Sequence, residues 1–125
     1  MGLMKLEHYT VKTGDLAGTI SFYENVLGMK DGEHPPFPFP GAWIYCGDTA
    51  VVHLIGDAPT DADDTGALDH IAFQGQGLSD FLANLDARDV DYRERDVPAT
   101  NLHQVFVEDP NGVTIEINFR GEATG

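Results

Sequence analysis

Four side chains in this sequence have the chemistry to bind one metal ion: His8, His53, His70 and Glu116. Imidazole and carboxylate groups are common ligands of divalent metals, and two histidines with one carboxylate are typical of non-haem Fe(II) sites. The same donors also suit zinc, nickel or manganese, so the identity of the metal stays open among these four. A single histidine on a strand is more often a hydrogen-bonded core residue, so the prediction depends on all four side chains meeting.

An internal repeat connects the two histidines His8 and His70. The segment 6–11 reads LEHYTV and the segment 68–73 reads LDHIAF, at a constant separation of 62 positions. Each segment alternates as a strand does, and each is followed by a glycine-containing turn and a helical pattern. The two histidines therefore occupy equivalent positions in two copies of one unit.

A second part of the repeat connects His53 with Glu116. The segment 49–54, TAVVHL, corresponds at a separation of 63 positions to the segment 112–117, GVTIEI. Strand alternation puts Glu116 on the face opposite to the large apolar side chains of its own strand. Two pseudo-symmetric units bring equivalent positions toward a common axis, so we expect the four side chains to converge on one metal ion. Burying three imidazoles and a carboxylate without a metal would be costly.

Each half of the chain carries the pattern of a βαβββ module. The modules extend over 5–56 and 67–120, and a polar linker, 57–66, joins them in a single domain, 1–125. We expect an α+β fold in which the paired modules form a curved mixed sheet with the helices outside. The predicted strands are 5–11, 43–46, 49–55, 68–73, 90–93, 102–108 and 113–119. One predicted helix begins at Leu16, and the other covers 78–88.

The composition excludes several classes of partner. The chain has 125 residues and a formal net charge of −14, from 21 Asp and Glu against 7 Lys and Arg. Such a surface repels phosphate backbones and anionic lipids, so we expect neither nucleic acid nor membranes as partners. No apolar run is long enough to span a bilayer, and residues 1–5 lack the apolar core of a signal peptide, which predicts a cytoplasmic protein. Cys46 is the only cysteine, which excludes an intrachain disulfide, and its flanks predict a buried thiol.

The sequence resembles the vicinal oxygen chelate superfamily, which groups glyoxalase I, bleomycin-resistance proteins and extradiol dioxygenases. Three stretches carry the resemblance, LEHYTVKTGDLAGTISFYENVLGM, LDHIAF and VFVEDPNGVTIEINF, and together they extend over most of the chain. The resemblance implies two βαβββ modules that form a U-shaped metal cleft, commonly within a homodimer. It also implies that His8, His70 and Glu116 are metal ligands, and that His53 stands where glyoxalase I-like members carry a fourth, acidic or amide ligand.

The histidine at position 53 helps to choose between the functions that the resemblance implies. In extradiol dioxygenases a second histidine near the metal serves as an acid–base residue, so His53 favours a metal-dependent enzyme of that kind acting on an oxygen-chelating substrate. A glyoxalase I-like lyase or isomerase is the alternative. A drug-binding module of the bleomycin-resistance type needs a cleft but no metal, and a non-catalytic dimeric domain is a further alternative.

Five further residues are candidates for lining a substrate pocket. His103 and Gln104 are neighbours on one predicted strand, so one of the two must face the cleft. Phe106 stands where a dioxygenase of the resembling family would carry a tyrosine, and Trp43 could add an aromatic wall. Arg120, just past the last predicted strand, could hold a substrate carboxylate.

Overall fold

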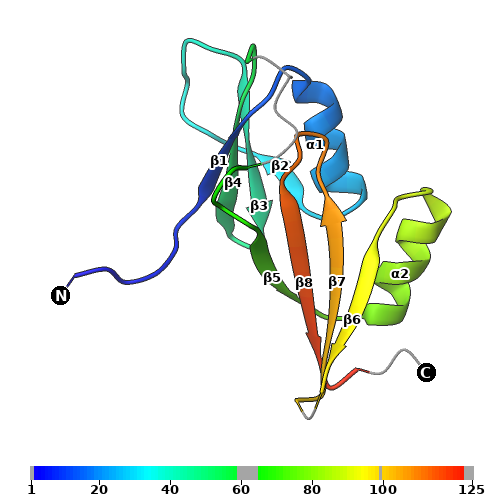
Figure 1. The fold of residues 1–125 in the computed structure, drawn as a ribbon. Helices are drawn as coiled ribbons and strands as arrows, with labels where there is room; N and C mark the ends of the chain where they lie inside the picture. The colour runs from blue at the N-terminus through cyan, green and yellow to red at the C-terminus, as the bar shows by residue number, and fades with distance from the viewer. Residues whose placement is uncertain (1, 59–64, 99, 123–125) are drawn as a thin grey trace. The chain divides into compact units, whose positions relative to one another are not determined.

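The computed structural model describes residues 2–58, 65–98 and 100–122, which fold as two compact units, Met1–Asp61 and Ala62–Gly125 (Figure 1). Each unit consists of one helix and one four-stranded mixed sheet. Part of the predicted linker, 59–64, lies outside the described residues. The predicted α+β fold of two βαβββ modules is confirmed.

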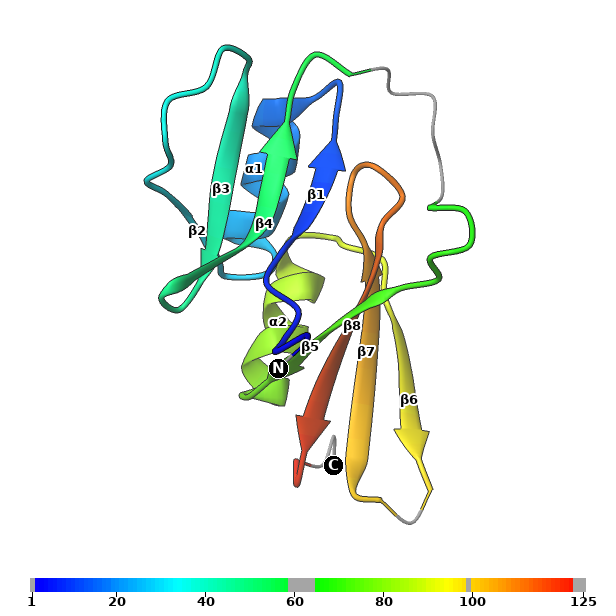
Figure 2. The ribbon, with the colours of Figure 1, turned by 90° about the vertical axis from the view of Figure 1, so that its left-hand side faces the viewer.

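The first unit has the strand order β1-β4-β3-β2. Strands β1 and β4 are parallel, while β3 pairs antiparallel with both β4 and β2. In Figure 2, α1 lies behind the sheet that contains β1, β4 and β3. The elements are β1 (Tyr9–Lys12), α1 (Leu16–Asn25), β2 (Lys30–Gly32), β3 (Gly41–Cys46) and β4 (Thr49–Ile55).

The second unit repeats this connectivity with the strand order β5-β8-β7-β6. Strands β5 and β8 are parallel, and β7 pairs antiparallel with both β8 and β6. The equivalence of the two strand orders is what the sequence repeat requires. The elements are β5 (Ile71–Gly75), α2 (Leu78–Ala87), β6 (Arg93–Val97), β7 (Leu102–Glu108) and β8 (Thr114–Arg120).

The two helices begin in different ways. The Asp15 carboxylate accepts a hydrogen bond from the backbone N–H of Gly18 at 3.0 Å, so Asp15 is the N-cap of α1. Helix α2 has no capping side chain of its own. Instead, the carboxylate of Glu122 accepts from the backbone N–H groups of Gly77 and Leu78, which lie about 45 positions earlier in the chain.

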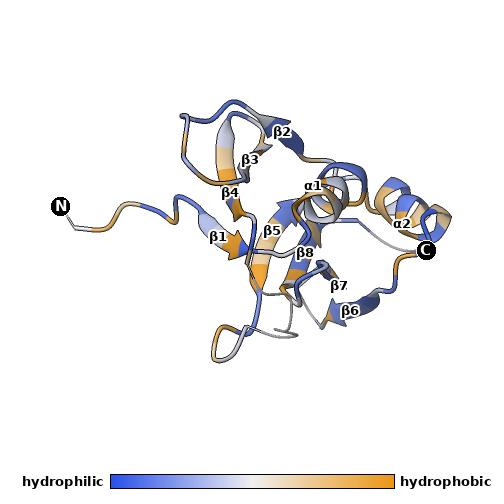
Figure 3. Cartoon of the chain, turned by 90° about the horizontal axis from the view of Figure 1, so that it is seen from above, coloured by the Kyte–Doolittle hydropathy of each residue, from blue (hydrophilic) through white to orange (hydrophobic). Residues whose placement is uncertain are grey.

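Each sheet has one apolar face, and its helix covers that face. Apolar and polar residues alternate along β8, TIEINFR, as expected for a sheet with two unlike faces, and Figure 3 shows hydrophobic and hydrophilic segments on the strands of both units. In the second unit Phe81 of α2 contacts Phe119 of β8, which fixes the helix on that face. The buried core residues include Val11, Ile44, Val52 and Leu54 in the first unit and Leu85, Val105, Ile115, Ile117 and Phe119 in the second.

Several strand boundaries differ from the prediction. Strands β1 and β5 begin at Tyr9 and Ile71, so both histidines of the repeat lie directly before a strand. The sixth strand covers Arg93–Val97, whereas the sequence predicted 90–93. The prediction for Cys46 was wrong, because its side chain is exposed at the end of β3, beside a turn. No helix among the described residues is long and apolar enough to cross a membrane.

Candidate metal and substrate site

The first unit stacks three rings on the face of its sheet that α1 does not cover. His53 on β4 is in register with Trp43 on β3, and their rings stack with centroids 4.2 Å apart and planes 11° from parallel. The ring of His8, directly before β1, stacks on His53 with centroids 3.7 Å apart and planes at 12°. His8 and His53 are therefore in contact. Because their rings are nearly parallel, one ring has to turn before both can donate to a single ion.

Each of these two histidines has one ring nitrogen engaged and the other available. His8 Nδ1 lies 3.0 Å from Glu7 Oε1, and His53 Nε2 lies 3.1 Å from the carbonyl oxygen of Ala50. Oxygen acceptors require these nitrogens to carry the proton, which leaves His8 Nε2 and His53 Nδ1 as the lone-pair nitrogens of neutral rings. Burial lowers the pKa of His53, and the charge of a protonated His8 lowers it further, so the neutral form is favoured.

The second unit brings His70 and Glu116 together. His70 Nε2 lies 3.4 Å from Glu116 Oε1, and Glu116 is buried. The other carboxylate oxygen, Oε2, accepts a hydrogen bond of 2.8 Å from Asn118 Nδ2. The hydrogen bond with Asp69 raises the pKa of His70, with a smaller contribution from Glu116 in the same direction. A buried carboxylate needs a positive partner, and a divalent cation or a protonated His70 can supply it.

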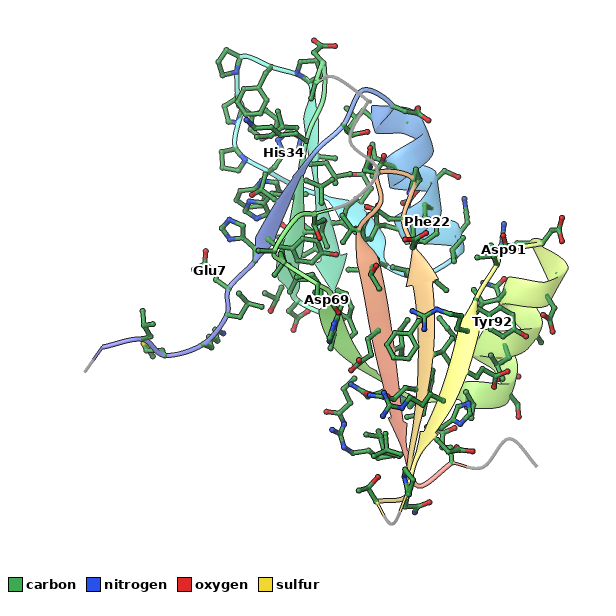
Figure 4. The ribbon with its side chains drawn as sticks, in the orientation of Figure 1. Glu7, Phe22, His34, Asp69, Asp91 and Tyr92 are labelled. Carbon is green, nitrogen blue, oxygen red and sulfur yellow. The ribbon has the colours of Figure 1, made fainter. Side chains whose placement is uncertain are left out.

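The residue before each repeat histidine is acidic, and in both units it bonds to Nδ1 of that histidine. The distances are 3.0 Å for Glu7 to His8 and 2.8 Å for Asp69 to His70. Figure 4 labels Glu7 ahead of β1 and Asp69 ahead of β5. A carboxylate on Nδ1 fixes the tautomer that presents Nε2 to a metal, an arrangement common around metal-binding histidines. The sequence contained this signal in the two acid–histidine pairs, but the prediction did not use it.

The predicted ligands thus come together as two pairs, one in each unit. Within the described part of the chain, no point gathers three or more His, Cys, Asp or Glu side chains able to hold a metal. The chemistry of the pairs nevertheless fits a divalent transition metal, because it combines neutral imidazoles with one buried carboxylate. That all four serve one ion stays a prediction.

Three of the predicted substrate-lining residues share the face of the second sheet that carries Glu116. Phe106 on β7 is directly opposite Glu116 on β8, and Gln104 is opposite Asn118, whose Oδ1 accepts from Gln104 Nε2 at 3.1 Å. Arg120 ends β8 on the same face and is exposed. Their contact with a substrate stays a prediction.

His103 lies on the opposite face, toward α2, so Gln104 is the member of this pair that shares the face of Glu116. The imidazole is 5% exposed and sits between two carboxylates of β6, with Nδ1 2.6 Å from Asp96 and Nε2 2.9 Å from Glu94. Two carboxylate acceptors require both nitrogens to donate, so the ring is an imidazolium. Burial alone lowers the pKa of His103, but the hydrogen bonds to Asp96 and Glu94 outweigh it and raise the pKa.

Each unit also has a hollow, and none of the four predicted ligands lines either of them. A hollow of about 650 Å³ in the first unit is lined by Trp43, Tyr45 and His34, among others. His34 lies in the loop between β2 and β3, and its ring stacks on Phe37 of the same loop with centroids 4.2 Å apart. A hollow of about 540 Å³ in the second unit is lined by Phe106, Thr114 and Arg93, among others. Both volumes suit small-molecule ligands.

Comparisons with known proteins agree with the fold and the resemblance. A lactoylglutathione lyase from Salmonella typhimurium is 31% identical over 123 residues, which cover 91% of each chain. A glyoxylase/bleomycin resistance protein/dioxygenase domain from Frankia sp. EAN1pec superposes with a TM-score of 0.78 at 17% identity, covering 98% of this chain and 96% of that one. A second solved structure is the E126Q mutant of the fosfomycin resistance protein FosX from Listeria monocytogenes, in complex with Mn(II) and 1S,2S-dihydroxypropylphosphonic acid. It superposes with a TM-score of 0.76 at 17% identity, covering 94% of this chain and 93% of that one.

The family assignment follows from a match over most of the chain. The model of the Glyoxalase/Bleomycin resistance protein/Dioxygenase superfamily matches residues 5–117. That range includes both acid–histidine pairs and Glu116. The two βαβββ modules are likewise the fold of the solved structures that the chain resembles. This chain is a member of the Glyoxalase/Bleomycin resistance protein/Dioxygenase superfamily.

Proposed function

We propose that this protein is a divalent-metal-dependent lyase of the glyoxalase I kind, which acts on the hemithioacetal formed by glutathione and a 2-oxoaldehyde. The observation that carries the proposal is the approach of His70 Nε2 to buried Glu116 Oε1, in a chain similar over 91% of its length to a lactoylglutathione lyase. This relative supports the lyase alternative better than the dioxygenase that the sequence favoured.

The ligands that we propose are His8, His70 and Glu116, and His53 is the candidate for a fourth position. Iron, nickel, zinc and manganese all fit these donors. When bound, the ion supplies Lewis-acid polarisation of the substrate oxygens. The protein then has to hold the donors, and the hydrogen bonds of Glu7, Asp69 and Asn118 do so by fixing two imidazoles and one carboxylate oxygen.

The proton transfer requires a base that takes a proton from one carbon of the hemithioacetal and returns it to the neighbouring carbon. No oxidant is needed, because the two carbons exchange oxidation states within one molecule. We assign this role to His53, as the alternative to its binding the ion, because its one free lone pair cannot serve both; Glu116 is the other catalytic side chain. A lowered pKa keeps the His53 imidazole neutral near pH 7, and its Nε2 is held by the Ala50 carbonyl, so Nδ1 is the basic atom.

The test is a lyase assay on metal-free protein reloaded with each ion in turn. We expect formation of the thioester product from methylglyoxal and glutathione to appear with at least one of nickel, zinc, manganese or iron(II), and to disappear with a chelator. The absence of product with all four ions would overturn the proposal.

A second candidate is extradiol-dioxygenase-like chemistry, which the histidine at position 53 favours over a carboxylate. Oxygen uptake with catechol in the presence of iron(II) tests it directly.

We also propose that the protein is a homodimer. Light scattering on the eluted protein is then expected to give twice the chain mass of 13.6 kDa.

A further inference from the structure

The three stacked rings of the first unit are not fixed equally by the backbone. Trp43 lies on β3 and His53 on β4, the two inner strands of the order β1-β4-β3-β2, so each has a paired strand on both sides. His8 precedes β1, which is an edge strand, and the register of β1 with β4 begins only at Tyr9. The residues on its N-terminal side, 2–7, are exposed and belong to no strand. The backbone therefore restrains Trp43 and His53 more than His8.

The hydrogen bonds of the two imidazoles differ in the same way. His53 Nε2 donates to the carbonyl oxygen of Ala50, a backbone group of its own strand, at 3.1 Å. His8 Nδ1 bonds at 3.0 Å to the carboxylate of Glu7, a side chain that is 79% exposed. A long exposed side chain loses rotamer freedom when it is held in one geometry, so its bond is weaker than one to a fixed carbonyl.

Trp43 and His8 cover opposite faces of the His53 ring. The strands β3 and β1 flank β4 on its two sides, and both rings lie nearly parallel to that of His53. Aromatic pairs of this kind favour the stacked arrangement by about 2- to 12-fold. When His8 leaves the stack, the contact with Trp43 remains to hold His53. When His53 leaves it, both contacts are lost.

We propose that Trp43 is a positioning residue, which holds the His53 imidazole in place while His8 is the ring that turns out of the stack to bind the metal ion. The nearly parallel rings require one of the two histidines to turn, and the restraints above select His8. With its ring held by Trp43 and by the Ala50 carbonyl, His53 keeps Nδ1 in one direction. The inference deepens the proposed function and rests on it only for the role of His53 as the base.

Ring-current shifts in metal-free protein test the stack without substrate or metal. NMR of protein with ¹³C-labelled histidine gives ring-proton signals for the five histidines, and His53→Gln assigns those of His53. We expect the His53 ring protons upfield of those of free histidine, because they lie against the indole. Trp43→Leu should remove most of this shift. Trp43→Phe keeps a ring at this place and should retain a smaller upfield shift.

The matched control is Phe39→Leu. It removes another ring of the first unit, one that is exposed and stacks on Phe37. The His53 signals should be the same in this variant as in the wild type. Unchanged His53 signals in both Trp43 variants, or an equal change in Phe39→Leu, would overturn the proposal.

Zinc, which is diamagnetic, then reports which ring moves. On addition of zinc to metal-free protein, we expect the His53 ring protons to keep the upfield shift caused by Trp43, while the His8 signals move further. A His53 ring that loses this shift while His8 keeps its signals would overturn the proposal. Absence of zinc binding would contradict the metal site, and the metal-free spectra alone would then decide the role of Trp43.

Kinetics separate the positioning role from the lyase proposal. Trp43→Leu is expected to lower kcat by about 10- to 100-fold and to change KM by less than about twofold, because a misplaced base slows the reaction without weakening substrate binding. Trp43→Phe should recover most of the rate. A raised KM with unchanged kcat would overturn the positioning role. A wild-type protein with the stack but no lyase activity would overturn the proposed function alone.

Discussion

At the scale of single residues, each repeat histidine is fixed by its own neighbour in the chain. Adjacent residues in a strand point to opposite faces, so Glu7 and His8, or Asp69 and His70, would be expected to diverge. Both pairs instead precede their strands, and in each the carboxylate bonds to the neighbouring imidazole. The repeat predicted which histidines are candidate ligands, and that assignment stays a prediction. It could not predict these bonds, or the stacking of His8, His53 and Trp43, because both depend on side-chain rotamers.

Asp69→Asn tests the role of the acidic neighbours. The amide keeps the size of the side chain but removes the charge that favours Nε2 of His70 as a donor. Loss of such an outer contact lowers metal affinity by about 10- to 100-fold, and Glu7→Gln should act similarly on His8. Competition with a chromophoric chelator measures the affinity. Asp89→Asn is the control, since it removes one exposed carboxylate elsewhere in the same unit. Unchanged affinity in both test variants would contradict the role.

Glu116→Gln tests the buried carboxylate. The variant keeps the shape of the side chain and its contact with Asn118, but it removes a buried negative charge. We expect loss of bound metal and of activity without loss of the fold, because the amide can still accept from Asn118 and, unlike the carboxylate, carries no charge whose burial is costly. Metal analysis and denaturant unfolding measure the two effects. A variant with full metal content and full activity would show that Glu116 is not a ligand.

At the scale of the elements, the helices and the closing hairpin were predictable and strand β6 was not. Leu16 and Leu78 begin the helices as predicted, and Asp109 Oδ1 accepts from Asn111 and Val113 in the predicted turn. These features depend on local signals, namely apolar spacing, capping and an Asn-Gly pair. Strand β6 has no buried residue, so hydrophobic periodicity carries no information about it. Its charged sequence is instead typical of an edge strand.

His103 on β7 bonds to two carboxylates of β6, and the stabilisation that these bonds give should depend on pH. Since its pKa is raised in the folded protein, the stabilisation is fully present below the ordinary pKa of about 6.5 and is lost as pH rises through the raised value. His103→Gln should therefore lower the free energy of unfolding by about 1 kcal/mol near pH 6, and by less near pH 9. Denaturant unfolding at both values measures the difference. An equal loss of unfolding free energy at both pH values would contradict an imidazolium at this position.

At the scale of the whole molecule, the metal binding that we propose for the two donor pairs would be coupled to stability. A ligand that binds only the folded protein stabilises it by RT ln(1 + [L]/Kd), which is about 2.7 kcal/mol at 100 times Kd. Reloading metal-free protein should therefore raise Tm, and Glu116→Gln should abolish the rise. Calorimetry with and without a chelator measures the effect. An equal rise in Tm for the variant and the wild type would indicate binding elsewhere, for example to surface carboxylates.

Cys46 gives the whole molecule a single thiol that can be labelled. It is the only cysteine in the sequence, and its thiol is exposed at the end of β3. A maleimide dye or nitroxide label will therefore attach at one position per chain without any mutation, and spin–spin measurements can then report the separation between two copies. The same exposure allows air oxidation to link two chains covalently. Such a species would mimic a native pair on a sizing column, so preparations need a reductant before their assembly state is assessed.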